Sequence, residues 1–207
     1  MHGRVVKAGL RPRGSEPALK PTPHRNPVLA KVLGGFATLA AGLDYAARGV
    51  TGFNFYSPRG ALEHALSYRD LRLMALQTAR KLLATGLKRG ERVAVVAETS
   101  PDFMAVFFGC QYAGLVPCPM PYSMYIGGRD AYVSRIAGML KTAKAEAVIG
   151  PNDLVSHISE AAEIAGTPIV KTFAELASMP ESVEKLRPFE VDDVAYSHVI
   201  KDRNGLN

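Results

Sequence analysis

Residues 68–121 decide the fold of this chain, and they read YRDLRLMALQTARKLLATGLKRGERVAVVAETSPDFMAVFFGCQYAGLVPCPMP. The first third predicts a helix, because small and apolar side chains recur on one face at spacings of three and four: Leu71, Ala75, Thr78, Ala79, Leu82 and Leu83. Gly86 follows, where helices commonly end in a left-handed residue, and Gly90 turns the chain again. We therefore expect a long helix that ends in a tight turn.

The remainder of this stretch predicts a strand, a helix and a second strand. Residues 92–97, Arg-Val-Ala-Val-Val-Ala, form the nearly continuous apolar run that is typical of a strand covered on both faces. Ser100 can cap the helix that follows, with Pro101 at its first position and Gly114 at its end. Residues 115–119 then form the second strand. Two strands joined by one helix imply a parallel pair with a right-handed crossover.

Four short segments of this stretch occur in a definite order and spacing: SYRDL at 67–71, GLKRGERVA at 86–94, SPDF at 100–103 and YAGLVP at 112–117. Together they resemble the amino-terminal part of the adenylate-forming acyl ligases, which include acyl-CoA synthetases and fatty acyl-AMP ligases. Gly127-Gly128-Arg129-Asp130, followed by Tyr132 and Arg135, points to the fatty acyl-AMP ligase branch. The resemblance extends over residues 43–196.

The rest of the chain continues the alternation of helices and strands. We predict helices over 28–47, from Asp130, from 151–153 to Gly166, and after a Thr172-x-x-Glu175 capping box; strands over 52–56, 66–68, 147–150, 168–170 and 191–196; and a loop over 122–128. Pro117, Pro119 and Pro121 require the strand near them to be short or partly off the sheet, since proline cannot donate to a ladder. The fold class is α/β, a mostly parallel doubly wound sheet with flanking helices. By resemblance it is an incomplete amino-terminal subdomain of an adenylate-forming ligase.

Three segments divide the chain. Residues 1–27 carry six basic side chains, one acidic side chain and five prolines, and we expect a disordered tail with a net charge of +5. Residues 28–196 are the partial ligase domain. Residues 197–207 form a carboxy-terminal tail that diverges from the family. The basic tail could contact nucleic acid or an anionic membrane, but a solvated tail is the simpler interpretation, and no aromatic residue interleaves with its charges.

Nucleotide use is the first chemistry that such a sheet suggests. A Walker loop and a Gly-x-Gly-x-x-Gly fingerprint are both absent. The resembled ligases hold ATP phosphates on a Ser/Thr/Gly loop that follows the strand matched here by residues 193–196, and Ser197 to Asn207 contain no such loop. The family's acidic ATP and magnesium ligands and its catalytic lysine have no counterpart either. We assign no catalytic, cofactor-binding or metal-binding residue, and expect ATP and Mg²⁺ only in the full-length family.

Other side chains have a functional and a structural interpretation. Gly127 to Asp130 could form an anion nest or a helix start; Glu98 follows a strand at the end where ligands bind; and Phe103, Phe107 and Phe108 suit an acyl pocket or the core. No nucleophile elbow surrounds the three candidate serines, Ser100, Ser123 and Ser134. The five histidines lack metal-ligand spacing: His2, His24, His64, His157 and His198. Cys110 and Cys118 suit buried thiols better than a disulfide or a metal pair. The structural interpretation is favoured for each.

The leading hypothesis is a truncated fatty acyl-AMP ligase or acyl-CoA synthetase-like protein. The family reaction is ATP-dependent activation of a fatty acid to an acyl-adenylate, and we expect this chain alone to be inactive. The alternative is a non-catalytic module that docks to another chain through the unfinished sheet edge. The longest apolar run, residues 32–43, is about half of a membrane span. The tail lacks the apolar core of a signal peptide, and its prolines oppose a transit-peptide helix, so we expect a cytoplasmic protein.

Overall fold

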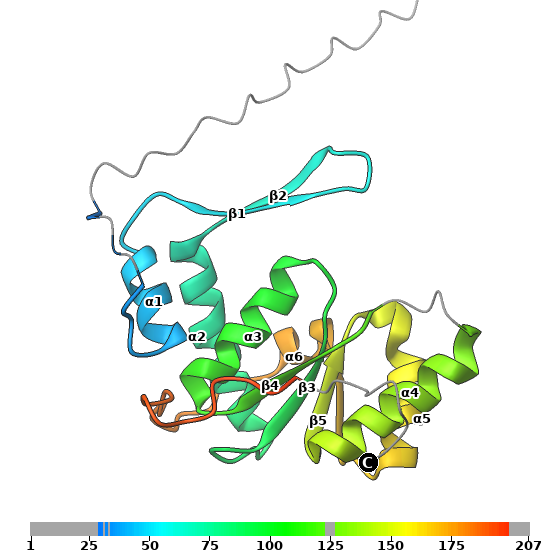
Figure 1. Cartoon of the computed structure of the whole chain (residues 1–207). Coiled ribbons are helices and arrows are strands. Elements are labelled where there is room, and N and C mark those ends of the chain that lie inside the picture. The colour runs from blue at the N-terminus through cyan, green and yellow to red at the C-terminus, as the bar shows by residue number, and fades with distance from the viewer. Residues whose placement is uncertain (1–28, 31, 33, 123–126, 199–207) are drawn as a thin grey trace, which may run out of the picture.

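The computed structural model describes residues 29–30, 32, 34–122 and 127–198 (Figure 1). In chain order the elements are α1 (Leu39–Ala46), β1 (Gly52–Tyr56), β2 (Leu62–Ser67), α2 (Tyr68–Ala84), β3 (Arg92–Val96), α3 (Pro101–Ala113), β4 (Val116–Met120), α4 (Gly128–Ala143), β5 (Ala145–Gly150), the 3-10 turn Asn152–Leu154, α5 (Val155–Ala165), β6 (Ile169–Thr172) and α6 (Phe173–Ser178). The predicted tail of residues 1–27 lies outside the described residues, as do residues 199–207.

Four parallel strands form the central sheet in the order β4-β3-β5-β6. One face packs against α2, α3 and α6, and the other against α4 and α5 (Figure 1). Successive residues of β3 alternate between the two cores: Val93 and Val95 join the first, whereas Ala94 and Val96 join the second. This arrangement confirms the predicted α/β class with a parallel sheet and flanking helices.

The predicted local signals that surround β3 are present. All four residues after Arg92 are fully buried in this strand, and burying each valine contributes roughly 1.5 kcal/mol. The Ser100 hydroxyl accepts from the Phe103 backbone N–H at 3.2 Å and so caps α3, and α3 ends on Gly114 in the left-handed conformation. Thr172 and Glu175 make both hydrogen bonds of the predicted capping box.

The β4 strand can contain Pro117 and Pro119 because it lies at the edge of the sheet. The backbone N–H of Val116 and the carbonyl of Met120 bond toward β3, so the alternate residues Pro117 and Pro119 direct their backbone away from the sheet. The missing N–H groups therefore fall on the outer side, where a strand can spare them. That outer side offers carbonyl acceptors at the two prolines and no N–H donors there.

This acceptor edge explains why the strand predicted over 191–196 is wrong. Residues 194–198 run in an irregular conformation beside β4, and the Ser197 N–H donates to the Pro117 carbonyl at 3.0 Å. A regular ladder requires donors and acceptors from both strands, and the prolines cannot donate. The segment is held beside the sheet without becoming part of it.

The predicted helix over 28–47 is also wrong in length, because only Leu39–Ala46 is helical among the described residues. Gly34 and Gly35 have φ values of 70° and 92°, which a right-handed helix does not accommodate. The Thr38 hydroxyl accepts from the Ala41 N–H at 3.1 Å and starts α1 there. The β1 and β2 strands then form an antiparallel hairpin that stands off the main sheet (Figure 1).

Candidate functional site

The carboxyl ends of the four parallel strands meet at one end of the sheet, where open α/β sheets bind their ligands. Glu98 follows β3, Tyr122 follows β4 and Asp153 follows β5. Asp102 lies in the first turn of α3, at the same end. The site that the fold offers therefore consists of three carboxylates and a phenol.

Glu98 is electrostatically the most perturbed of these carboxylates. Burial raises the pKa of Glu98 above its ordinary value, the neighbouring charges of Asp153 and Asp102 raise it further, and a hydrogen bond with Ser100 lowers it. The raised pKa means that the neutral, protonated form of Glu98 is favoured, first by burial and then by the two neighbouring carboxylates. The same charges disfavour an approaching phosphate.

The tyrosines at this end are fixed by hydrogen bonds. The Tyr122 hydroxyl donates to Asp153 at 3.1 Å, and the buried Tyr132 donates to the Pro121 carbonyl at 2.9 Å. Burial raises the pKa of Tyr132 to about 12. Its ring meets His157 edge-on, with the centroids 6.1 Å apart. These contacts attach α4 and α5 to the loop after β4 and leave Tyr132 uncharged at neutral pH.

The segment Gly127 to Asp130 starts a helix. Gly127 is the residue before α4 and has a φ of 88°, and Gly128 follows with a φ of 72°. The Arg129 guanidinium is ion-paired with Glu160 and with Asp130. Its charge is therefore balanced by side chains of the chain itself, which favours the structural interpretation over an anion nest.

The predicted serine and histidine candidates do not come together. Ser100 is the cap of α3, Ser134 is exposed on α4, and Ser123 lies outside the described residues. The three histidines that the structure describes are on separate elements, with His64 on β2, His157 on α5 and His198 beyond Ser197; His2 and His24 lie outside the described part.

The aromatic and thiol candidates serve packing. Phe103 and Phe108 lie against the first core, and the Phe107 ring contacts Tyr196 at 6.2 Å between centroids. Cys110 is a free buried thiol in the first core, and Cys118 is a free buried thiol in the second core, on the other face of the sheet. Burial is the first cause that raises the pKa of each, so both thiols remain protonated.

The residues at the carboxyl end do not fit MgATP by themselves. In the part of the chain that the structure describes, no three His, Cys, Asp or Glu side chains are grouped to hold a metal ion. The carboxylates at Glu98, Asp102 and Asp153 would repel phosphates, and the nearby Arg129 is already paired.

Sequence reasoning missed the contacts that hold residues 179–198, which we call the strap. Arg89 donates to the carbonyls of Arg187 at 2.5 Å and Pro188 at 3.1 Å, and is ion-paired with Asp193. Gln111, which is 1% exposed, donates through its side-chain amide to the Ala195 carbonyl. A single amide in the apolar second half of α3 is the sequence signal that identifies Gln111 as a candidate for a buried hydrogen bond.

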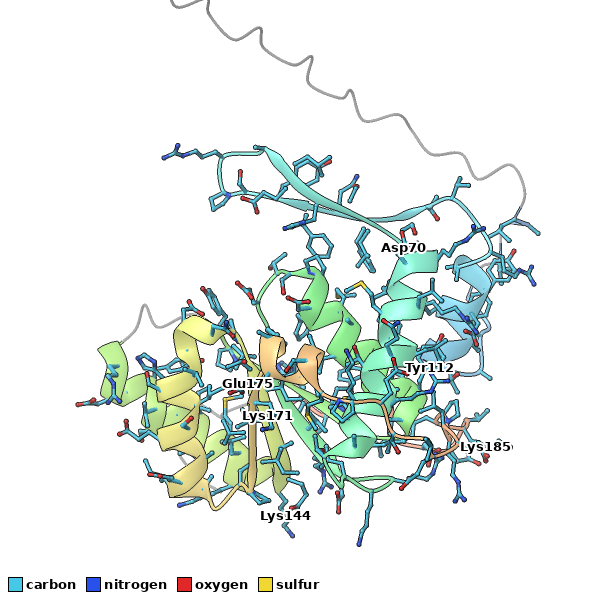
Figure 2. All side chains as sticks on the ribbon, turned by 180° about the vertical axis from the view of Figure 1, so that it is seen from behind. Asp70, Tyr112, Lys144, Lys171, Glu175 and Lys185 are labelled. Atoms are coloured by element: carbon cyan, nitrogen blue, oxygen red, sulfur yellow. The ribbon has the colours of Figure 1, made fainter. Side chains whose placement is uncertain are left out.

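A second missed cluster fastens α1 to the domain. The buried Tyr112 hydroxyl donates to Asp44 at 2.7 Å, and the Arg72 side chain donates to the same carboxylate oxygen at 2.6 Å. Figure 2 shows Tyr112 between the helices that carry these partners. Burial is the first cause that raises the pKa of Tyr112, and the hydrogen bond to Asp44 also raises it. The cluster is structural and lies away from the carboxyl end of the sheet.

The described helices are all too short or too polar to cross a lipid bilayer.

Comparison with known proteins gives the family. The pattern of the AMP-binding enzymes matches residues 54–198. A Caulobacter vibrioides (strain NA1000 / CB15N) protein named as a candidate acyl-CoA synthetase is 47% identical over 141 residues, which cover 68% of this chain and 25% of that protein. The rat mitochondrial acyl-coenzyme A synthetase ACSM2 is 33% identical over 97 residues, 46% of this chain and 16% of the relative.

A solved fatty acyl-adenylate ligase, from work on the E. coli and L. pneumophila enzymes, superposes with a TM-score of 0.74 and 36% identity. The match covers 78% of this chain and 30% of that structure. The chain thus spans about a quarter of the Caulobacter relative's length. Because the family pattern covers well over half of these residues and the sheet matches the amino-terminal region of such ligases, this chain belongs to the AMP-binding enzyme family.

Proposed function

We propose that this chain supplies the amino-terminal part of the large domain of a ligase that activates a fatty acid with MgATP. The reaction would yield a fatty acyl-adenylate and pyrophosphate. The observation that carries the proposal is the joint match to an acyl-CoA synthetase-like protein at 47% identity and to a fatty acyl-adenylate ligase at 36% identity. Residues 28–196 form the domain segment in this proposal.

The segment's role in this proposal is to build the sheet on which the ligase site is assembled. Its carboxyl end supplies Glu98, Asp102 and Asp153, which attract cations and repel phosphates. The groups that stabilise charge on transferring phosphates in such reactions are cations and oriented N–H donors. In this proposal such groups reach the carboxyl end of the sheet from other parts of the ligase, and the segment alone does not form acyl-adenylate.

A chimera tests the family role. Residues 54–198 would replace the matching segment of the Caulobacter relative, and fatty-acid-dependent ATP–pyrophosphate exchange would be measured. We expect exchange within about tenfold of the unmodified relative, because a correctly folded sheet preserves the site built upon it. A folded chimera with no exchange, beside an active parent, would overturn the proposal.

The isolated 207-residue chain tests the second part. It should show no fatty-acid-dependent exchange above a buffer blank, with the Caulobacter relative as the positive control. Turnover that co-purifies with the chain and depends on both ATP and fatty acid would contradict the proposed inactivity.

Docking to another chain is the second candidate function. The β6 strand is the outer strand on its side of the described sheet, and the strap exposes four large apolar side chains: Val183, Val191, Val194 and Tyr196. Free strand edges and exposed apolar groups both promote association. Size-exclusion chromatography with light scattering should then give a mass above 22.2 kDa, either alone or with an added acyl carrier protein. A monomer in both cases would exclude this role.

A further inference from the structure

A cavity of about 480 Å³ opens at the amino-terminal end of the sheet, opposite the carboxylates described above. It lies between the α2–β3 turn, the end of α3 and the strap. Its wall carries four cations and one carboxylate among nine residues: Leu83, Gly86, Leu87, Lys88, Arg89, Ala113, Glu184, Lys185 and Arg187. Figure 2 shows Lys185 on the strap, at the side of the molecule away from α4 and α5.

The charges of this wall are only partly balanced by the protein. Arg89 is neutralised by Asp193 and by the two strap carbonyls. The side chains of Lys88, Lys185 and Arg187 make no ion pair or hydrogen bond within the described part of the chain. Glu184 offsets one of these three charges. The side chains of the cavity wall therefore carry an excess of positive charge equal to about two cations.

Helix dipoles account for the presence of only two of the four cations in the cavity wall. The carboxyl ends of α2 and α3 lie at this end of the sheet, and their partial negative charge favours the cations of the α2–β3 turn, Lys88 and Arg89. The strap cations Lys185 and Arg187 come from a different segment, yet they line the same cavity. Two separate segments thus contribute unpaired cations to the wall of one cavity.

The size and the charge define a class of ligand. The volume falls within the range of small-molecule sites, roughly 300–1,000 Å³. Lysine and arginine together are the side chains that proteins use to hold phosphate groups. We propose that this cavity binds a phosphate group, either as the free ion or as the phosphate of an organic ester. The site lies at the opposite end of the sheet from Glu98 and does not rest on the proposed ligase function.

Isothermal titration calorimetry tests the site directly. The 207-residue chain, in a phosphate-free buffer of low ionic strength, would be titrated with inorganic phosphate and with phenyl phosphate. We expect saturable binding of at least one of them. The triple variant K88Q/K185Q/R187Q should bind about tenfold more weakly, because three exposed charges each contribute a modest share. Tighter binding of phenyl phosphate would identify an organic ester as the ligand, and equal affinities would identify the ion itself.

A matched variant controls for general charge. R59Q/R69Q/K141Q removes three exposed cations that do not line the cavity, and its affinity should stay within about twofold of the parent. Equal losses in both triple variants, or no saturable binding by the parent chain, would overturn the site. Should the cavity triple variant fail to fold by circular dichroism, the single variant Lys185→Gln and phosphate-induced amide shifts at Gly86 and Ala113 in the parent provide the test. In the ligase chimera the cavity triple variant should leave pyrophosphate exchange unchanged, so the two proposals fail separately.

Discussion

At its amino-terminal end the parallel sheet carries Lys88, Arg89 and the strap cations, and the chain is fastened there by hydrogen bonds from Arg89 and Gln111. At its carboxyl-terminal end it carries Glu98, Asp102 and Asp153, and the pKa of Glu98 is raised there, first by burial and then by the charges of Asp153 and Asp102. One end is thus held together by long-range contacts, while the other holds a carboxylate whose charged form is disfavoured by burial and by its neighbours. We expect substitutions at the two ends to differ in size and in sign.

The largest effect is expected from Gly114→Ala at the amino-terminal end. Gly114 has a φ of 71°, and an added Cβ would lie 2.6 Å from the Arg187 carbonyl oxygen. Backbone strain and the clash together should lower the free energy of unfolding by about 3 kcal/mol, measured by urea denaturation. Gly86→Ala is the matched control, because its φ is 92° and its Cβ would meet no atom within 4 Å. We expect a loss of about 1 kcal/mol there. Equal losses would show that the strap does not press on Gly114.

Arg89→Ala should come next. The change removes the ion pair to Asp193 and two hydrogen bonds to strap carbonyls. Because the pair is about one-third exposed, we expect a loss of only about 1–2 kcal/mol. Hydrogen exchange should accelerate at Phe189 and Ser197, whose N–H groups bond to Gln111 and Pro117. Arg59→Ala, at an exposed position, is the control and should change neither the free energy of unfolding nor the exchange rates of these two amides. Unchanged exchange in the Arg89 variant would mean that Gln111 holds the strap without it.

A smaller loss is expected from Tyr112→Phe, near the end of α3. The variant lacks the hydroxyl that donates to Asp44, and a buried hydrogen bond of this kind contributes about 1 kcal/mol. The loss should appear in urea denaturation together with faster hydrogen exchange in α1. Tyr68→Phe changes a partly buried tyrosine whose hydroxyl makes no described hydrogen bond, and it should stay within about 0.5 kcal/mol. Protection of α1 that survives in the Tyr112 variant would assign its attachment to the apolar contacts of Leu43 instead.

The smallest effect, and the one of opposite sign, is expected from Glu98→Gln at the carboxyl-terminal end. The pKa of Glu98 is raised in the folded protein above its ordinary 4.5, so its contribution to stability is present below pH 4.5 and is lost as the pH rises through the folded pKa. The variant should therefore be more stable than the parent at pH 7, by about 0.3 kcal/mol after solvent screening. The difference should vanish below pH 4.5.

Thermal unfolding at pH 7 and pH 4 measures this difference. The exposed Glu63→Gln on β2 is the matched control for the removal of one surface carboxylate. Destabilisation by Glu98→Gln at pH 7 would reverse the expected contrast between the two ends of the sheet.

The predictable features of this fold are those that a few neighbouring residues determine. Three local signals each span at most six residues: the apolar run of β3, the Ser100 cap and the Thr172 capping box. The structure confirms all three. The class of the sheet follows from them, because alternating strands and helices leave few arrangements.

The errors and omissions arise where the local structure depends on residues that are far away in the sequence. The predicted strand over 191–196 has a suitable local sequence. It lies beside Pro117, about eighty residues earlier, and a proline has no N–H with which to form a ladder of hydrogen bonds. Arg89 reads as an ordinary turn cation, and its partners lie 98 to 104 residues later. The acidic end of the sheet was foreseen only through Glu98, because the approach of Asp153 depends on how β5 is placed beside β3.

The separation between Arg89 and its acceptors has a consequence for synthesis of the protein. Ribosomes add about 5–20 residues per second, and Asp193 follows Arg89 by 104 residues. The guanidinium is therefore made about 5–20 s before its last partner exists. During that time the β3–β5 pair of strands can form while the basic end remains open, so the strap closes over a sheet that already exists.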